Sequence, residues 1–380
     1  MKNNLLTLCV LFSFSLSALA QENNPIVTAV PSLSIAPDAR AGGMGDIGAG
    51  TSPDVNSQYW NPAKYVFMES DAGVSVSYTP WLRKLVGDIS LSYVAGYWKF
   101  DQRQALSMSL RYFSLGTITL RDGTGENQGT ANPNEYSIDF SYSRMLSEKF
   151  SAAATLRYIH SDLNNGINIP GSGTDMVPGS AVAADIAAYY KTPITLQGTD
   201  CNLGLGINIS NIGSKISYDQ NETSNFIPTN LRVGGSFNYP IDNYNKISFS
   251  ADLNKLLVPT PKLNPTSAEV TAYNNISPIA GIFQSFSDAP GGFKEEMEEI
   301  MWSVGAEYAY NNQFFVRGGY FNENQFKGNR KYFTAGAGFK LNVFQLDAAY
   351  VVSTSQSNPL DQTLRFSLSF DLFGLKNLVK

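Results

Sequence analysis

The feature that most constrains this chain is an alternation of apolar and polar residues that recurs along its length. Large apolar side chains occupy every second position in residues 364–372 (LRFSLSFDL), 136–142 (YSIDFSY) and 106–112 (LSMSLRY), and the pattern recurs in 247–253 and 74–78. Successive side chains of a β-strand point to opposite faces of the sheet. Each segment therefore predicts a strand with one apolar and one polar face.

The first residues indicate export. Lys2, an apolar run over residues 5–16 and the small-residue site Ala18-Leu19-Ala20 before Gln21 are typical of a secretory signal peptide. Removal of the signal leaves Cys201 as the only cysteine. An internal disulfide is then excluded, so an exported chain of this length must be stabilised in another way.

Composition indicates where the apolar faces lie. Charged residues make up 16% of the chain, against about 25% in ordinary soluble domains, whereas aromatic residues make up 12%. No segment after the signal reaches the roughly 18 apolar residues of a membrane helix. Many alternating segments of about ten residues in an exported chain fit an outer-membrane β-barrel better than a soluble sandwich. The formal net charge of −5 and the lack of a long basic run argue against a nucleic-acid partner.

The spacing of the segments predicts an all-β fold, an antiparallel transmembrane barrel of about fourteen strands. Connections on one side are short and those on the other are long, a difference that a soluble sandwich does not predict. Only residues 192–201 are long for an inner turn. The predicted strands centre near Val76, Ser92, Ser109, Asp139, Thr155, Asp185, Gly206, Gly234, Ser250, Gly305, Gly318, Ala337, Ala348 and Ser367. The short inner turns are 100–103, 146–149, 311–312 and 342–343, and the long outer loops are 116–134, 161–178, 210–228 and 257–300.

A barrel of this size has a lumen that its own small inward residues do not fill. Residues 21–72 lack sustained alternation, so we expect them to fold into the lumen as a plug. Gly43, Gly45 and Gly48 have the G-x-G-x-x-G spacing of a dinucleotide-binding loop, but the flanks carry neither the strand nor the helix that such a site requires. We interpret them as a tight turn close to the barrel wall. The predicted organisation is a signal peptide (1–20), a plug (21–72), a barrel (73–373) with a large outer insertion (257–300), and a periplasmic tail (374–380).

Three stretches carry a resemblance to a known family. Residues 39–46 (ARAGGMGD), followed by 59–63 (YWNPA) and by 290–297 (PGGFKEEM), resemble the PorV proteins of the type IX secretion system. PorV proteins are distant relatives of the FadL-like fatty-acid transporters. The residues of this signature are Gly42, Gly43, Gly45, Trp60, Asn61 and Pro62.

The resemblance implies a non-enzymatic protein of the Gram-negative outer membrane, in contact with its lipid and with both termini in the periplasm. It implies binding of the C-terminal signal domain of secreted cargo at the large translocon barrel. Delivery to the surface attachment complex and its sortase would follow. The alternative is a FadL-like transporter for fatty acids or other hydrophobic small molecules, which predicts an apolar pocket running from the outer loops through the wall to the plug.

The outer loops contain the candidate partner-binding residues. Phe293, Met297, Ile300 and Met301 would form one apolar stripe on a helix, and Phe283 and Phe286 lie nearby in the sequence. Such a stripe would either pack against the barrel mouth as a lid or form a docking surface for the cargo or the translocon. Trp81 and Leu82 in the first outer loop fit an anchor at the membrane interface or a docking role equally.

Catalytic and metal-binding chemistry finds little support. His160 is the only histidine, so neither a Ser-His-Asp set nor a histidine metal cluster can be assembled. The acidic run from Glu295 to Glu299 lacks the spacing of a calcium loop and predicts a solvated helix face. We expect no catalytic residue, no metal and no cofactor. Asp139, Asp185 and Asp252 lie on polar strand faces and are expected to pair inside the lumen.

Overall fold

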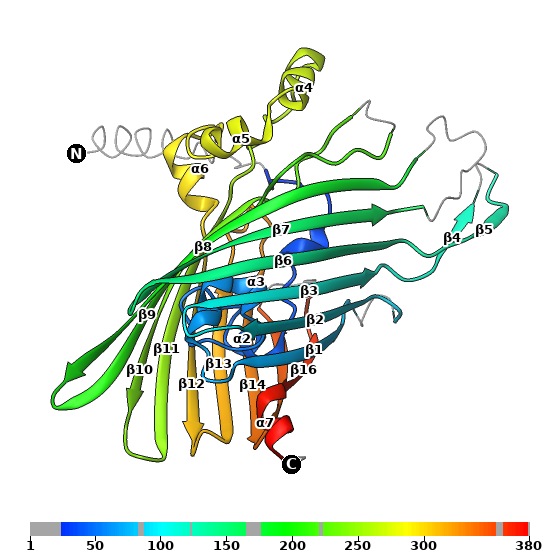
Figure 1. Cartoon of the computed structure of the whole chain (residues 1–380). Coiled ribbons are helices and arrows are strands. Elements are labelled where there is room, and N and C mark those ends of the chain that lie inside the picture. Colours follow the sequence, from blue (N-terminus) through cyan, green and yellow to red (C-terminus); the bar gives the residue numbers. More distant parts are fainter. Residues whose placement is uncertain are drawn as a thin grey trace, which may run out of the picture.

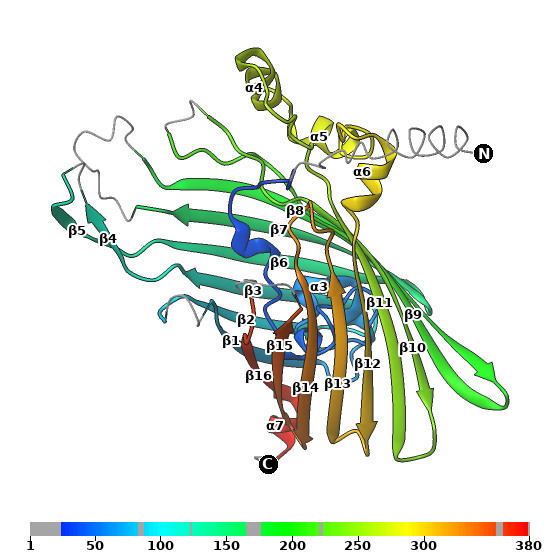
Figure 2. The same cartoon turned by 180° about the vertical axis from the view of Figure 1, so that it is seen from behind.

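The computed structural model describes residues 24–82, 87–121, 124–164, 176–219, 223–354 and 360–378, so the predicted signal peptide lies outside it. Fourteen antiparallel strands close into one barrel (Figures 1 and 2), which confirms the predicted fold and strand number. The strands are β1 Ala72–Pro80, β2 Ser90–Lys99, β3 Gln104–Ser114, β6 Asn134–Ser147, β7 Phe150–Asp162, β8 Gly179–Leu196, β9 Thr199–Gly213, β10 Asn230–Pro240, β11 Asn245–Leu256, β12 Met301–Tyr310, β13 Phe314–Asn322, β14 Lys331–Leu341, β15 Phe344–Ser353 and β16 Leu364–Asp371. Two short strands, β4 Ile118–Arg121 and β5 Asn127–Ala131, form a separate hairpin in the loop between β3 and β6.

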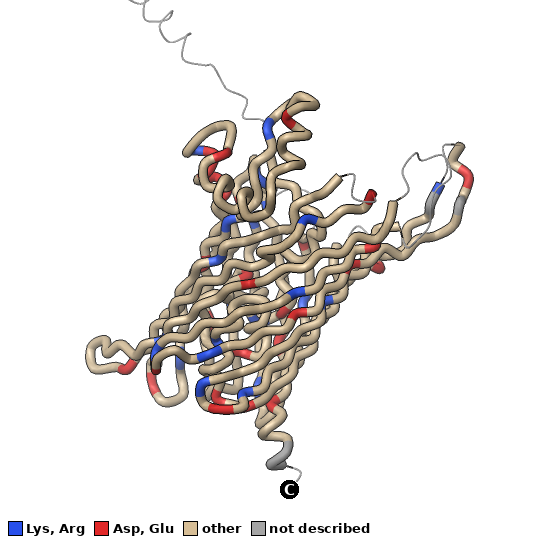
Figure 3. Tube along the Cα trace, turned by 45° about the horizontal axis from the view of Figure 1, so that its top comes forward, with Lys and Arg blue, Asp and Glu red and all other residues tan. Residues whose placement is uncertain are grey.

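The strand faces are inverted relative to a soluble protein. In β1, Val76 and Tyr78 are 50% and 49% exposed, whereas Ser75 and Ser77 are buried. The barrel closes where β1 pairs with β16, and there the Ser77 and Ser367 hydroxyls share a hydrogen bond of 2.7 Å inside the lumen. Figure 3 shows acidic and basic residues in the turns and the insertion, with long uncharged stretches along the strands. Apolar side chains outside and polar ones inside are what a lipid-embedded barrel requires.

The turns at one end are short, as predicted. Asn311 and Asn312 between β12 and β13 have φ of 53° and 52°, and Asn342 between β14 and β15 has φ of 49°. Asparagine tolerates this left-handed conformation, which two-residue hairpin turns require. The prediction of a long inner connection at 192–201 was wrong. These residues instead extend β8 and β9, with pairs such as Ile194 and Cys201, into a hairpin that projects beyond the barrel (Figure 1).

The opposite end carries the insertion between β11 and β12. It contains three helices, α4 Ser267–Asn274, α5 Pro278–Gln284 and α6 Phe293–Glu298, which lie above the mouth (Figure 1). The helix α7, Leu372–Leu378, follows β16 at the far end of the barrel. In the described part of the chain, none of the helices is both long and apolar enough to cross a membrane.

Residues 24–71 run through the lumen from one mouth to the other. The segment contains four short helices: η1 Pro31–Ser34, α2 Ala39–Gly42, α3 Ser57–Trp60 and η2 Pro62–Phe67. It begins beside the insertion, where the Asn24 amide N–H donates to the Phe326 carbonyl at 3.0 Å and its side chain donates to Glu295 at 3.2 Å. It ends at the opposite rim, where β1 starts. The described chain therefore starts at one mouth and ends with α7 at the other. The two termini that are expected on the periplasmic side lie outside the described residues.

Candidate interaction surface and lumen

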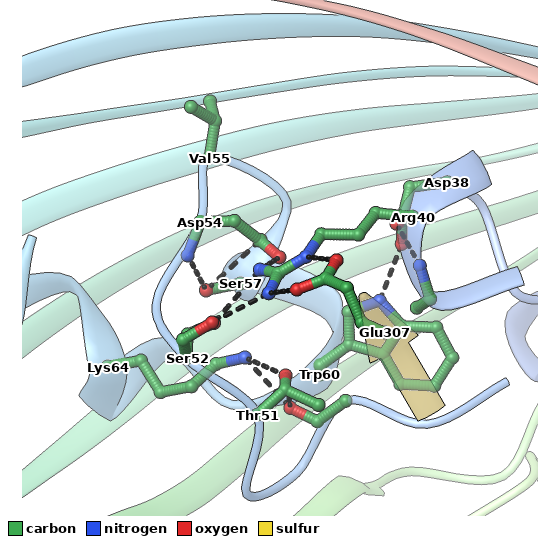
Figure 4. Close-up of polar contacts among 12 residues, drawn as sticks. Asp38, Arg40, Thr51, Ser52, Asp54, Val55, Ser57, Trp60, Lys64 and Glu307 are labelled. Atoms are coloured by element: carbon green, nitrogen blue, oxygen red, sulfur yellow. Dashed lines mark hydrogen bonds and ion pairs between the residues drawn. The ribbon is translucent and has the colours of Figure 1, made fainter. Parts of the chain in front are cut away.

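A single carboxylate joins the two signature stretches inside the lumen. Asp38 caps α2 by accepting a hydrogen bond from the Ala41 amide at 2.9 Å, and it accepts a second one from Trp60 Nε1 at 2.6 Å (Figure 4). Asp38 and Trp60 are almost completely buried. Sequence reasoning did not single out Asp38, although an Asp directly before a short helical run is a typical N-cap signal.

The Asn-Pro pair of the signature links the luminal segment to the wall. The Asn61 side chain accepts from the Ala63 amide at 3.1 Å and donates to the carbonyls of Ala49 and Ala188 at 3.1 and 2.9 Å. Ala188 belongs to β8. Pro62 opens η2, where its missing N–H leaves no bond unmade. These two residues therefore fix the start of a helix and its distance from the barrel.

The glycine-rich loop touches the wall backbone to backbone. Gly45 has φ of 81°, and a Cβ there would lie 2.9 Å from the Tyr320 amide nitrogen. A Cβ on Gly43 would lie 3.0 Å from Gly336, and one on Gly319 would collide with the carbonyl of Met44. A Cβ on Gly42 would lie 2.9 Å from Cδ of Arg365 and closer still to its Nη1. The predicted close approach of this loop to the wall is confirmed.

Arg40 is the centre of a buried charge network that sequence reasoning missed. Its guanidinium pairs with Asp54 at 2.7 Å and Glu307 at 3.3 Å, and it donates to the Ser52 hydroxyl at 2.6 Å (Figure 4). Glu307, on β12, also accepts from Arg317 at 2.6 Å. The network crosses from the luminal segment to the wall, so it holds the segment in place electrostatically.

The three predicted luminal aspartates do pair inside the barrel. Arg157 bridges Asp139 at 2.7 Å and Asp185 at 2.9 Å, all on neighbouring strands. Asp252 accepts from the amides of Gly48 and Ala49 at 2.8 and 3.0 Å. Asp252 therefore secures the glycine-rich loop, and the other two secure the wall itself.

Buried ion pairs hold α6 on the mouth. Glu299 accepts from Lys255 at 2.6 Å and from Lys327 at 3.0 Å, and Glu296 accepts from Lys255 at 3.1 Å. The prediction of a solvated acidic face was wrong for these two glutamates, because the cations that neutralise them come from strand and loop residues distant in sequence. Burial, together with nearby Glu296 and Glu299, raises the pKa of Asp288 to about 6.

The insertion leaves several large apolar side chains uncovered. Phe283 and Phe286, in and just after α5, are 73% and 51% exposed, and Phe293 and Met297 on α6 are 80% and 52% exposed. They do not pack as a lid on the mouth. An open groove of about 720 Å³ lies between α6 and the outer wall, and Leu253, Phe293, Met297, Ile300 and Trp302 line its apolar part.

Two predicted docking residues belong to the interior instead. Met301 does not continue α6: it opens β12 and packs, 7% exposed, against Phe321, Tyr332 and Val351. It faces the lumen because the chain changes there from helix to strand geometry. Trp81 packs against Ile35, Leu91 and Phe113 rather than projecting to the membrane interface. Leu82 is half-buried with φ of 51°.

His160 lies at the outer end of β7. Its ring is 4.9 Å from that of Tyr136, and Nδ1 is 3.1 Å from the Ser180 hydroxyl. No group of three or more His, Cys, Asp or Glu residues in the described ranges is placed to hold a metal ion.

Comparison with known protein families shows which family the chain belongs to. A family model described as "Type IX secretion system protein PorV" matches residues 18–263, which extend from the predicted signal peptide through β11. The chain belongs to the PorV family. Membership and the barrel fold place this PorV-family protein in the outer membrane of a Gram-negative bacterium, in a family associated with type IX secretion and not with catalysis.

Solved structures support the architecture alone. A "CymD monoaromatic hydrocarbon channel" has a TM-score of 0.51 at 13% identity, covering 91% of this chain and 99% of that one. A "TodX deltaS2S3 mutant monoaromatic hydrocarbon channel" has a TM-score of 0.51 at 10% identity, covering 88% and 98%. A FadL homologue from Pseudomonas aeruginosa has a TM-score of 0.45 at 12% identity, covering 92% and 99%. No curated protein matches the sequence.

Proposed function

We propose that this PorV-family barrel binds the C-terminal signal domain of secreted cargo at the translocon barrel and carries it to the surface attachment complex with its sortase. The observation that carries the proposal is the exposed apolar surface of the insertion, formed by Phe283, Phe286, Phe293 and Met297. Large uncovered apolar side chains grouped at one end of a protein are typical of a protein-docking surface.

The anchoring of the insertion supports this proposal. Lys255 and Lys327 hold α6 through buried ion pairs, so its exposed side chains are presented on a fixed base. Pre-organised surfaces lose less conformational entropy when a partner binds. The luminal segment acts as a plug in this proposal, because its backbone contacts the wall through glycines of β13 and β14.

A second function is favoured by the groove beside α6. Its apolar lining fits the alternative of a FadL-like transporter for hydrophobic small molecules. That function requires an apolar path onward into the lumen. The cavity beneath the outer mouth is only about 80 Å³, and four arginines contribute to its lining: Arg111, Arg157, Arg232 and Arg330. It offers no apolar path through the lumen for a whole hydrophobic molecule, so we favour the shuttle.

The test is gentle detergent extraction of the tagged protein from its native membrane, with mass spectrometry of co-purifying proteins and lipids. We expect the translocon barrel and secreted proteins with a common C-terminal domain, and loss of both from a Phe283→Asp/Phe293→Asp double variant. Val270→Asp is the matched control, because Val270 is 43% exposed on α4 in the same insertion. Recovery of a stoichiometric apolar ligand without protein partners would favour the transporter.

A further inference from the structure

The outer half of the lumen contains a cavity of about 80 Å³ above the signature residues. Strand ends at the outer mouth contribute Met301, Phe321 and Tyr332 to its lining, and the luminal segment contributes Tyr59 and Trp60. Because residues 36–67 occupy the lumen on the inner side, the cavity is placed to receive a ligand from the outer mouth. Two of the arginines that line it are unlike the other luminal arginines.

Arg111 is buried and forms no ion pair with a described carboxylate, because Glu135 and Asp139 act on its charge only from a longer distance. It is 3% exposed, and its Nη1 donates to the carbonyls of Ser32 and Ile35 at 2.6 and 2.9 Å. Its Nη2 is buried and finds no acceptor among the described residues. Its Cζ lies 4.7 Å from the centre of the Tyr59 ring.

Arg232 contacts the same tyrosine ring. Its Cζ lies 5.2 Å from the centre of Tyr59 and 4.5 Å from that of Trp60, and its Nε donates to Asn254 at 2.8 Å. No carboxylate in the described part of the chain forms an ion pair with Arg232 or Arg111. By contrast, Arg40, Arg157, Arg317, Arg330 and Arg365 each pair with at least one carboxylate.

Burial of a cation without an ion pair is unfavourable, and so is burial of an N–H group without an acceptor. The nearby carboxylates reduce this cost without forming an ion pair, because each accepts from other groups: Glu135 from Ser32 and Ser161, and Asp252 from the amides of Gly48 and Ala49. Asp139 pairs with Arg157, and Asp46 pairs with Arg365 and accepts from Tyr332 at 2.6 Å. A ligand that brings a negative charge would satisfy the open Nη2 of Arg111 and pair with the half-buried Arg232.

We propose that Arg111 and Arg232 bind the oxyanion of a ligand, a carboxylate or phosphate group, in the outer half of the lumen. The planar guanidinium fork matches such groups, and both guanidinium groups contact the Tyr59 ring. The small cavity admits the anionic group alone. The remainder of the ligand, if it has one, extends toward the outer mouth. This inference goes beyond the proposed shuttle function and does not depend on it.

The test uses the full mature barrel, purified in a non-ionic detergent and titrated at constant ionic strength. Acetate and inorganic phosphate represent a free ion, and laurate represents an amphiphile, with 1-dodecanol as its uncharged counterpart. Trp60 emission reports binding, because Arg232 lies over that ring. The emission change should disappear in Trp60→Phe, which would assign it to Trp60. Calorimetry measures the affinity independently.

We expect saturable binding of at least one anion, weakened about tenfold or more in Arg111→Gln or Arg232→Gln and unchanged in Arg103→Gln. Arg103 lies exposed in an inner turn. Arg232→Lys keeps the charge without the fork, and thermal unfolding of each variant shows that the barrel is folded. A response to laurate alone identifies an amphiphile, and a response to acetate or phosphate identifies a free ion. Absence of binding by all three anions, equal binding by the double variant, or equal affinity for 1-dodecanol would overturn the proposal.

Discussion

The luminal segment and the insertion meet at the same mouth, but the first buries its large apolar residues and the second exposes several of them. Ile47 and Trp60 in the luminal segment are 0% and 1% exposed, whereas Phe283 and Phe293 in the insertion are 73% and 80% exposed. Both regions are secured by buried ion pairs. The luminal segment holds its position with both apolar and charged side chains. The insertion holds its position through ion pairs and leaves large apolar side chains exposed.

The comparison predicts that a buried ion pair of the luminal segment contributes more to stability than an exposed ion pair of the insertion. Arg40→Met leaves the partly buried Asp54 without its cation and removes one of the two cations that pair with Glu307, so we expect a loss of about 3 kcal/mol in the free energy of unfolding. The matched change Lys262→Met in the insertion removes an ion pair whose side chains are 67% and 39% exposed, and should cost at most about 1 kcal/mol. Denaturant unfolding in detergent micelles measures both. Equal losses would contradict the comparison.

A second prediction concerns the contact between the luminal segment and the wall. Gly319→Ala places a methyl group against the Met44 carbonyl, so we expect about 2–3 kcal/mol of destabilisation. Gly318→Ala is the control, because its Cβ meets only the Thr334 carbonyl, at 3.9 Å. Thermal unfolding followed by circular dichroism measures the difference. If both variants unfold together, the loop does not depend on this close approach.

The insertion should respond to pH through Asp288. Its pKa of about 6 in the folded chain lies above its ordinary value of 3.8, so protonation favours the folded insertion. This contribution is complete below pH 3.8 and is lost as the pH rises through about 6. Because the group is half-exposed, we expect roughly 1 kcal/mol between pH 7.5 and pH 5.

Hydrogen exchange of residues 257–300 at the two pH values measures this increment. Asp288→Asn should remove it, while Asp242→Asn in an exposed turn should leave it intact. Persistence of the full pH dependence in Asp288→Asn would assign it to another group.

The smallest effect on stability is expected at the docking surface. Phe293→Ser changes a side chain that is 80% exposed, so the free energy of unfolding should change by less than about 0.5 kcal/mol. Phe321→Ser, which opens the buried cluster around Met301, is the contrasting variant and should cost about 3–5 kcal/mol. A large loss in Phe293→Ser would mean that α6 packs within its own fold and is not available to a partner.

Local pattern in the sequence was sufficient for the barrel. Alternation at a period of two is a property of neighbouring residues, so it located all the barrel strands and the faces of Asp139, Asp185 and Asp252 before any contact was known. The gaps between these segments located the short turns as well. The signature glycines predicted a close backbone approach, although the wall glycines that they meet come from β13 and β14.

The tertiary structure decided what depends on residues distant in the chain. Sequence periodicity extended the apolar stripe to Met301, but pairing of β12 with β11 begins there and turns that side chain into the lumen. The sequence predicts that Glu296 and Glu299 are solvated. In the folded barrel, Lys255 and Lys327 contact them at the outer mouth. The same holds for Arg111 and Arg232, because whether a described carboxylate reaches them to form an ion pair depends on several strands at once. Ion pairs and burial are long-range properties, and local sequence does not encode them.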